Sequence, residues 1–383
     1  MIIFDLKKLF SSGRIGNVSI KNRIMRSATF EGLASREGFV TDELIKLHTN
    51  LAKGGTGLII TGASAVDVRY TVGSRCTCLN DDSFINSHKK LVDAVHEYSE
   101  VKIGPQLAHN GRLGKHPKYK PVTPSLVLHK TTNQVPKELT LDEIQELVMK
   151  FAAAGRRAYE SGYDMVQLHG SHGYLLSSFL SSITNKRIDQ FGGSIENRVK
   201  ILVDIYNYLR DEVGKNFPII VKLQVVDGVP NGLTLEESKK LAKILVNTGY
   251  NAIEPSGGII ELLEETTNAL PSKKIKDPED ENYLLSAAKE LKPILKNCSL
   301  ILVGGIRNPT SAENIIQNNQ CDFISMSRPL ICEPDLPNRW KDGDYSPTRC
   351  ISCNSCLMEI FAGHPVHCVV KKKSELRRMK TEK

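Results

Sequence analysis

Short apolar runs recur along the chain, and segments with a helical pattern separate them. Each run is too short for a helix, and its near-continuous apolarity is typical of a parallel strand covered on both faces. We predict eight strands, at residues 24–27, 58–61, 102–107, 165–169, 219–223, 252–255, 300–303 and 323–326.

The segments between these runs carry helix signals. Thr140 and Thr234 each begin a Thr-x-x-Glu sequence, in which side chains satisfy the free amides at a helix start. Helices are also predicted at residues 42–53, 194–213, 281–292 and 309–318. Eight strands alternating with helices predict an α/β fold of the TIM (β/α)8 barrel type. A doubly wound sheet is the alternative, but it would more often show an early Gly-x-Gly-x-x-Gly turn, which is not found.

In a TIM barrel the active site lies at the carboxyl ends of the strands. Residues suited to chemistry lie near or just after the ends of the predicted strands: Thr29, Ala63, Gln106, His109, His169, His172, Tyr174, Lys222, Ser256, Gly257, Gly258, Gly304, Gly305, Ser327 and Arg328. Core packing alone does not explain this distribution. We therefore expect an active site at that end of the barrel.

His169, His172 and Tyr174 follow the fourth strand. Two imidazoles and a phenol that converge there could hold a substrate oxygen and deliver a proton. Half a zinc site, or two hydrogen-bonded structural histidines, are the alternatives, since His-x-x-His is a weak motif by itself.

Three features near the last strands point to anion binding. Gly304 and Gly305 expose backbone amides and Arg328 adds a charged fork, as in barrels that bind phosphate after strands seven and eight. A surface ion pair is the alternative for Arg328. Lys222 lies inside an apolar strand, where its charge needs a partner. We favour an anionic ligand over a buried carboxylate as that partner.

Charge and hydropathy limit the classes of function. Of the net charge of +8, residues 371–383 contribute +5, from seven Lys or Arg and two Glu, so the rest of the chain carries only +3. No basic helix with interleaved aromatics occurs elsewhere, which argues against nucleic-acid binding. The sequence contains no run of about 18 apolar residues, so no membrane span is predicted. The N-terminal residues lack the pattern of a signal peptide, so we expect a cytoplasmic protein.

The nine cysteines fall into two groups. Cys350, Cys353, Cys356 and Cys368 are clustered, with spacings of two, two and eleven residues. This arrangement is typical of an iron–sulfur site, although zinc also suits four thiolates. The others are scattered, at Cys76, Cys78, Cys298, Cys321 and Cys332.

Several motifs together resemble the Old Yellow Enzyme family of FMN-dependent ene-reductases. The resemblance runs in order over about residues 5–340 and rests on NRI at 22–24, GTGLIIT at 55–61, QLAHNGR at 106–112, VGGIR at 303–307 and SMSR at 325–328. It implies a TIM barrel at residues 1–345 that holds non-covalent FMN. Residues 346–383 would form a separate cysteine-cluster segment and basic tail.

The resemblance also assigns roles to residues. Ala63 and Gln106 would contact the isoalloxazine ring, and Lys222 would take the place of the family's cation near flavin N1 and O2. The FMN site would comprise Ser27, Ala28, Thr29, Ala63, Gln106, Lys222, Gly304, Gly305, Ser327 and Arg328, with Gly305 and Arg328 at the phosphate. His169 and His172 would bind the oxygen of an α,β-unsaturated substrate, and Tyr174 would donate the proton. NAD(P)H would be the reductant.

Two departures from the family pattern bear on the flavin. Many relatives have proline where Ala28 stands here, and a cysteine or threonine that tunes the flavin about where Phe30 stands. Thr29 could replace that residue. Lys222 stands where arginine is common, and a compact ammonium supplies charge without the planar fork.

The cysteine cluster resembles that of the family's iron–sulfur branch, which includes 2,4-dienoyl-CoA reductase and trimethylamine dehydrogenase. This favours [4Fe–4S], with zinc or free thiols left open. Branch members continue into FAD- and NAD(P)H-binding domains that do not follow here. Electrons are therefore expected from NAD(P)H directly or from a separate carrier protein that docks on the basic tail. A dimer or larger homo-oligomer is common in such barrels.

Two alternatives to C=C reduction remain. An amine dehydrogenase would need several aromatics to recognise a cation, and the chain has a single tryptophan, Trp340. A flavin or iron–sulfur electron-transfer subunit would need no proton donor, so His169, His172 and Tyr174 argue against it.

Overall fold

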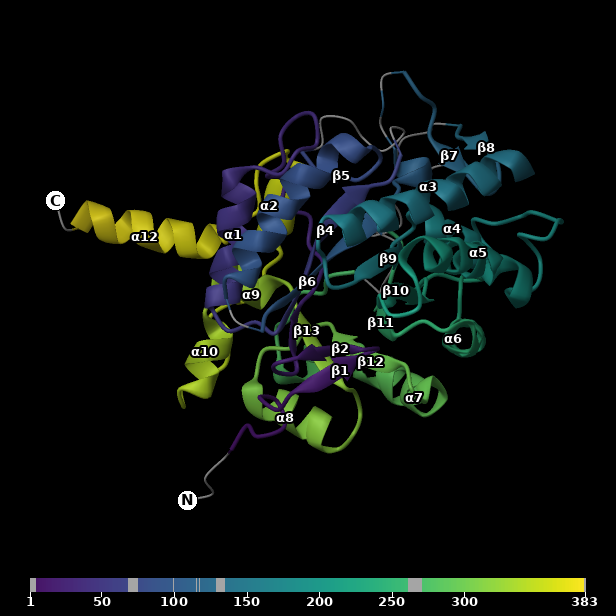
Figure 1. The fold of residues 1–383 in the computed structure, drawn as a ribbon. Helices are drawn as coiled ribbons and strands as arrows, with labels where there is room; N and C mark the ends of the chain where they lie inside the picture. Colours follow the sequence, from purple (N-terminus) through teal and green to yellow (C-terminus); the bar gives the residue numbers. More distant parts are fainter. Residues whose placement is uncertain are drawn as a thin grey trace.

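The computed structural model describes residues 5–67, 75–98, 100–114, 116, 118–128, 135–260 and 271–381. Its centre is a closed barrel of eight parallel strands with helices around it, which confirms the predicted TIM barrel (Figure 1). The strand order is β3-β13-β12-β11-β10-β9-β6-β4, and β3 pairs with β4 to close the ring. The strands are β3 (Ile24–Arg26), β4 (Leu58–Ala65), β6 (Lys102–Ala108), β9 (Val166–Gly170), β10 (Ile219–Val226), β11 (Ala252–Gly257), β12 (Ser299–Val303) and β13 (Phe323–Met326).

Apolar side chains fill the amino-terminal half of the barrel. Leu58 and Ile220 stand early in their strands, Met165 directly precedes β9, and Met25 lies in the short strand β3; all four belong to one buried cluster. A hairpin of β1 (Gly13–Ile15) and β2 (Val18–Ile20) adds Ile15 and Ile20 to that cluster. The sequence did not indicate this hairpin. Because this end of the barrel is packed, a ligand would have to approach from the carboxyl ends of the strands.

The outer helices are α1 (Asp42–Lys53), α2 (Ile85–His96), α3 (Leu141–Glu160), α5 (Ile195–Val213), α6 (Leu235–Thr248), α7 (Leu285–Leu295) and α8 (Pro309–Gln317). The capping boxes predicted at Thr140 and Thr234 are both present. The predicted start of α7 at residue 281 is wrong. Asn282 has a φ of 53°, a left-handed conformation that a right-handed helix does not contain, and so α7 begins only at Leu285.

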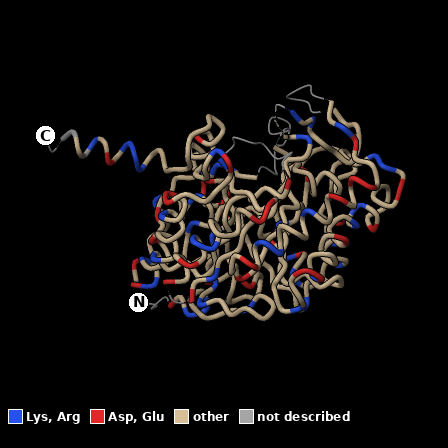
Figure 2. Tube along the Cα trace, turned by 45° about the horizontal axis from the view of Figure 1, so that its top comes forward, with Lys and Arg blue, Asp and Glu red and all other residues tan. Residues whose placement is uncertain are grey.

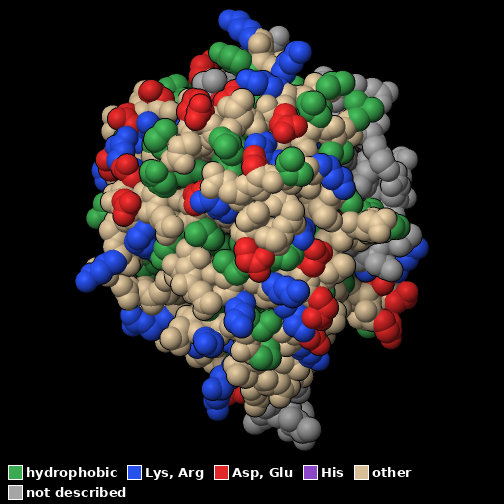
Figure 3. Space-filling model, turned by 90° about the vertical axis from the view of Figure 1, so that its right-hand side faces the viewer, with side chains coloured by type: hydrophobic (Ala, Val, Ile, Leu, Met, Phe, Trp, Pro, Cys, Tyr) green, Lys and Arg blue, Asp and Glu red, His purple; other side chains and the backbone are tan. Residues whose placement is uncertain are grey.

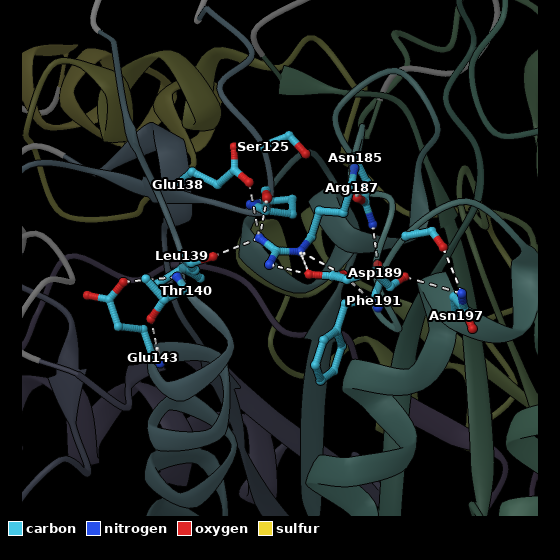
Figure 4. Close-up of polar contacts among 12 residues, drawn as sticks. Ser125, Glu138, Leu139, Thr140, Glu143, Asn185, Arg187, Asp189, Phe191 and Asn197 are labelled. Carbon is cyan, nitrogen blue, oxygen red and sulfur yellow. Dashed lines mark hydrogen bonds and ion pairs between the residues drawn. The ribbon is translucent and has the colours of Figure 1, made fainter.

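A buried arginine fixes the loop between α4 (Leu175–Leu180) and α5 (Figure 4). The Arg187 guanidinium donates to the carbonyl oxygens of Pro124 (2.8 Å) and Leu139 (2.7 Å) and to the Asp189 carboxylate (2.6 Å). These contacts join the loop to the strands β7 (Val122–Thr123) and β8 (Lys137–Glu138). They hold the segment that follows His169, His172 and Tyr174.

The chain beyond the barrel strands forms α9 (Arg328–Cys332), α10 (Leu336–Lys341), α11 (Ser355–Phe361) and α12 (Val369–Thr381). It packs on barrel loops, since Thr348 N–H donates to Arg307 O (2.9 Å) and Val366 N–H donates to Glu31 O (2.8 Å). The division predicted after residue 345 stays a prediction.

The basic tail is largely the helix α12, which projects away from the barrel (Figures 1 and 2). On the face turned to the viewer in Figure 3, side chains of both charge signs are interspersed, which fits the small net charge of the body. In the part of the chain that the structure describes, no helix has the length and apolar character needed to cross a membrane.

Candidate functional site

A buried ion pair stands at the centre of the site. Lys222 on β10 and Glu254 on β11 are partners in the parallel register, and Lys222 Nζ lies 2.7 Å from Glu254 Oε2. The side chains are 4% and 0% exposed. Ser27 Oγ donates to Glu254 Oε1 (2.8 Å) and lies 3.2 Å from Lys222 Nζ. The partner of Lys222 within the chain is thus a carboxylate, and our preference for a ligand in that role was wrong.

Two glutamines extend this network across the barrel. Gln167 Nε2 donates to Glu254 Oε2 (2.8 Å), and Gln106 Nε2 donates to Gln167 Oε1 (2.7 Å). Gln106 also pairs in register with Ala63 of β4. The chain of contacts links the loop after β3 to β6, β9, β10 and β11, so the network fixes the relative positions of Gln106 and Lys222.

The donors and acceptors of this network fit the pyrimidine edge of a flavin. An ammonium has three hydrogens, and the Lys222 contacts engage two of them. Gln106 spends one amide hydrogen on Gln167, which leaves its carbonyl oxygen as an acceptor. A cationic donor beside an amide acceptor matches a ring edge that alternates carbonyl oxygens with an N–H group.

His169, His172 and Tyr174 converge where β9 ends, as predicted. The His169 ring centroid lies 5.3 Å from that of His172 and 4.9 Å from that of Tyr174. His172 has a φ of 69°, and Gln224 Oε1 accepts its backbone N–H (2.7 Å). His172 also forms a parallel bridge with Ile259. His169 also pairs in register with Lys222, so the two groups of residues adjoin.

Burial determines the protonation of these side chains. It lowers the pKa of His169 to about 3, with a further contribution from Lys222. Burial holds the pKa of His172 well below 6.5, and the nearby His169 and Lys222 lower it further. Burial also raises the pKa of Tyr174 to about 12. Both imidazoles are therefore neutral at pH 7, and the phenol carries its proton.

The lowered pKa of His169 predicts a pH dependence of stability. The unfolded state, with a histidine pKa near 6.5, binds more protons than the folded state between about pH 3 and 6.5. Stability is therefore lost as pH falls through this window, by about 1.4 kcal/mol per pH unit from His169. Urea unfolding from pH 6 to pH 4 should show a shallower decline for His169→Gln than for the wild type. Equal slopes would contradict the neutral folded-state imidazole.

The loop after β3 contributes three small residues in different ways. Ser27 joins the Lys222–Glu254 network, while Thr29 Oγ1 lies 2.8 Å from Ser327 Oγ. Ala28 packs against the apolar cluster inside the barrel. A flavin contact of this loop would thus come through Ser27 and the Thr29–Ser327 pair.

At the predicted phosphate site, Gly304 and Gly305 both have left-handed φ values, of 108° and 77°. The Tyr283 ring packs so closely on both residues that a Cβ atom on Gly304 would lie 2.8 Å from a ring carbon. Arg328 Nη1 donates to Asn354 Oδ1 (2.7 Å) and to Ser352 O (3.1 Å). Arg328 therefore ties the predicted phosphate site to the cysteine segment. Its contact with phosphate stays a prediction.

The four clustered cysteines line one small cavity together with Arg328, at Cys350, Cys353, Cys356 and Cys368. Within the described residues, no group of three or more His, Cys, Asp or Glu side chains is placed to hold a single metal ion. An iron–sulfur cluster makes a different demand, since each thiolate binds its own iron atom. Four thiols around one cavity fit that donor set.

Comparison with known proteins now identifies the family. The profile of the NADH:flavin oxidoreductase / NADH oxidase family matches residues 8–346. The chain belongs to this family. The Old Yellow Enzyme homologue from Zymomonas mobilis, 25% identical, superimposes with a TM-score of 0.72 over 89% of this chain and 94% of its own. The resemblance to Old Yellow Enzymes is thereby confirmed, and membership in this family supports FMN as cofactor and NAD(P)H as reductant.

Other family members are similar over nearly the whole chain. The NADH oxidase of Thermoanaerobacter brockii is 37% identical over 94% of this chain and 55% of its own length. The 4,4'-dithiodibutanoate disulfide reductase of Rhodococcus erythropolis is 31% identical over 95% of each chain. A 2-naphthoyl-CoA reductase structure, 27% identical, has a TM-score of 0.87 over 95% of this chain and 57% of its own. The chain thus spans little more than half the length of the NADH oxidase and the naphthoyl-CoA reductase.

Three polar residues of the site were not predicted from the sequence: Gln167, Gln224 and Glu254. A usable signal existed for Glu254. It stands third in its apolar run, and Lys222 stands fourth in a neighbouring one. Two opposite charges within adjacent parallel strands predict a pair once the register is known.

Proposed function

We propose that this protein is an FMN-dependent oxidoreductase that uses NAD(P)H to reduce activated C=C bonds of enoates, enones or enoyl thioesters. The observation that carries this proposal is the convergence of two neutral imidazoles and a protonated phenol at the end of β9. A protein that only transfers electrons would need neither a pair of imidazoles to bind an oxygen nor a phenol to donate a proton. A reaction that builds negative charge on an oxygen and then protonates carbon uses all three.

We assign the ring hydrogens of the two histidines on the basis that their serine partners donate to them. His172 Nε2 lies 2.6 Å from Ser256 Oγ, and a hydroxyl that donates to Nε2 leaves the hydrogen on Nδ1. His169 Nδ1 lies 3.5 Å from Ser171 Oγ, which leaves Nε2 of that ring for a ligand. Each neutral ring then offers one N–H to the substrate oxygen.

These groups stabilise the reaction in complementary ways. FMN, when bound, supplies the hydride that adds to Cβ of the substrate. The two N–H groups stabilise the negative charge that develops on the substrate oxygen. Tyr174, neutral because of its raised pKa, donates a proton to Cα. Lys222 and Gln106 would hold the cofactor, and Glu254 organises the network that positions them.

Product analysis in D2O tests this assignment. The FMN-loaded protein with NADPH and 2-cyclohexenone should give cyclohexanone with one deuterium at Cα, from the exchanged phenol, and hydrogen from NADPH at Cβ. His172→Ala should greatly reduce this conversion and leave the amount of bound FMN unchanged. No conversion of cyclohexenone, cinnamaldehyde or an enoyl thioester by the flavin-loaded wild type would reject C=C reduction.

We also propose that Cys350, Cys353, Cys356 and Cys368 hold a [4Fe–4S] cluster, supported by their shared cavity. Anaerobically purified protein should contain about four iron and four sulfide per chain. Cys353→Ser should lose most of both, whereas Cys298→Ser, a buried cysteine outside this cavity, should retain them. One zinc per chain, or no metal, would contradict the cluster.

An electron-transfer role fed by a separate carrier protein is the second candidate. Arg328 favours it, because one guanidinium contacts the cysteine segment and stands at the predicted phosphate site. In that case NADH and NADPH would both fail to reduce the bound flavin, and dithionite would succeed.

A further inference from the structure

Two of the scattered cysteines lie side by side at a strand on the edge of the site. Cys76 and Cys78 flank Thr77 at β5 (Thr77–Cys78), which pairs with the end of β4. Cys76 directly precedes this two-residue strand, and Cys78 is its last residue. Thr77 Oγ1 lies 2.7 Å from Ser64 Oγ, which fixes the residue between the cysteines to β4. The two cysteines therefore adjoin the end of β4.

The two thiols are in contact and differ in exposure. The Cys76 thiol hydrogen-bonds to the Cys78 sulfur, and this lowers the pKa of Cys78 below its usual value of 9.0. Cys76 is buried, at 7% exposed, whereas Cys78 is partly accessible. Its greater access makes Cys78 the thiol that an external disulfide reaches first, with Cys76 behind it.

The neighbouring residues hold Cys78 in place. Cys78 N–H donates to Gly38 O (3.0 Å), and Cys78 O lies 3.1 Å from His88 Nε2. Gly38, at a φ of 98°, passes so close to Cys78 Sγ that a Cβ atom there would collide with it. The chain thus places a glycine where the sulfur needs room.

The pair also adjoins the proposed flavin site. Cys76 and Cys78 belong to one apolar cluster with Ala63, Ala65, Ala108 and Phe30. Ala63 is the register partner of Gln106, and the resemblance places both at the flavin ring. A disulfide bond between the two sulfurs would therefore change the packing beside Ala63 at the proposed flavin site.

We propose that Cys76 and Cys78 form a redox-active dithiol whose substrates are low-molecular-weight disulfides. The Cys78 thiolate attacks a disulfide RSSR, forms a mixed disulfide and releases one RSH. Cys76 then attacks the Cys78 sulfur, an internal Cys76–Cys78 bond forms, and the second RSH leaves. The cysteines lose two electrons and two protons, and the external disulfide gains both. This reaction needs no flavin, so it stands or falls independently of the proposed function.

Peptide mapping tests the proposal. Cleavage after Arg75 and Lys89 yields residues 76–89, which contain Cys76 and Cys78 and no other cysteine. The holoprotein is treated with excess glutathione disulfide, denatured, alkylated with N-ethylmaleimide and digested with trypsin. We expect this peptide to lose both alkyl groups and to be two hydrogens lighter than the dithiol form, and to regain both groups after dithiothreitol.

Single variants test the order of attack. Cys76→Ser should stop at the mixed disulfide, so that its peptide 76–89 carries one glutathione, on Cys78. Cys78→Ser should remain unmodified, as should the buried Cys298 in the wild type, whose pKa burial raises to about 12. Full alkylation of peptide 76–89 in the treated wild type would overturn the proposal. So would a glutathione adduct on Cys298 equal to that on Cys78.

Discussion

Replacing Glu254 with leucine is expected to lower the free energy of unfolding by about 3–5 kcal/mol, because it leaves a buried ammonium without its counter-charge. Lys222 is 4% exposed and Glu254 is inaccessible to solvent, so water cannot replace the lost carboxylate. Ser27 and Gln167 lose an acceptor as well. Urea denaturation of the cofactor-free protein measures the loss.

The double variant Lys222→Met/Glu254→Leu is the matched control for this prediction. Removing both charges avoids the unpaired ion, so the double variant should be more stable than Glu254→Leu alone. Glu290→Leu, which removes an exposed partner of Lys239, should change stability far less. Additive losses from the two single variants would contradict a buried pair.

The Tyr174→Phe variant is expected to reduce kcat for an enone by about 10²- to 10⁴-fold, the range for loss of a positioned general acid. Its ring stays against His169, so binding of substrate and cofactor should change little. Stopped-flow measurement should show unaltered reduction of the flavin by NADPH and slow reoxidation by 2-cyclohexenone.

Tyr163→Phe provides the control for that experiment. Tyr163 is also buried, but its hydroxyl contacts His88 Nδ1 (2.7 Å) and not the residues at the end of β9. Its turnover should remain within a few-fold of the wild type. If Tyr174→Phe turned over as fast as Tyr163→Phe, another group would have to supply the proton.

The apolar pattern was sufficient to predict the barrel. Strands buried on both faces are apolar almost throughout, so each appears in the sequence as a nearly continuous apolar run. All eight predicted runs coincide with barrel strands. The β1–β2 hairpin was missed because its strands have only three residues each, too few for a periodic pattern.

The site was predicted only in part, because its contacts depend on register. His169, His172 and Tyr174 stand near one another in sequence, so local reasoning brought them together. The Lys222–Glu254 pair depends on how β10 and β11 align, which no local pattern encodes. The same is true of Gln106 and Gln167, on neighbouring strands β6 and β9.

The contacts of Arg328 show a further limit. Its place after the last strand suggested a phosphate ligand, and local sequence gave no sign of its bonds to Ser352 and Asn354. Those bonds depend on how the cysteine segment folds back on the barrel. The position of Cys76 and Cys78 beside Ala63 likewise arises from the pairing of β5 with β4.

We propose that Gln106, Lys222 and Arg328 belong to a flavin site at which NAD(P)H and an unsaturated substrate react in turn. An anaerobic absorbance spectrum, recorded before and after NADPH and again after 2-cyclohexenone, tests it most directly. We expect bands close to those of free FMN, bleached by NADPH and restored by the enone. Protein that binds no flavin, even when FMN is added in excess, would contradict the roles assigned to Gln106, Lys222 and Arg328.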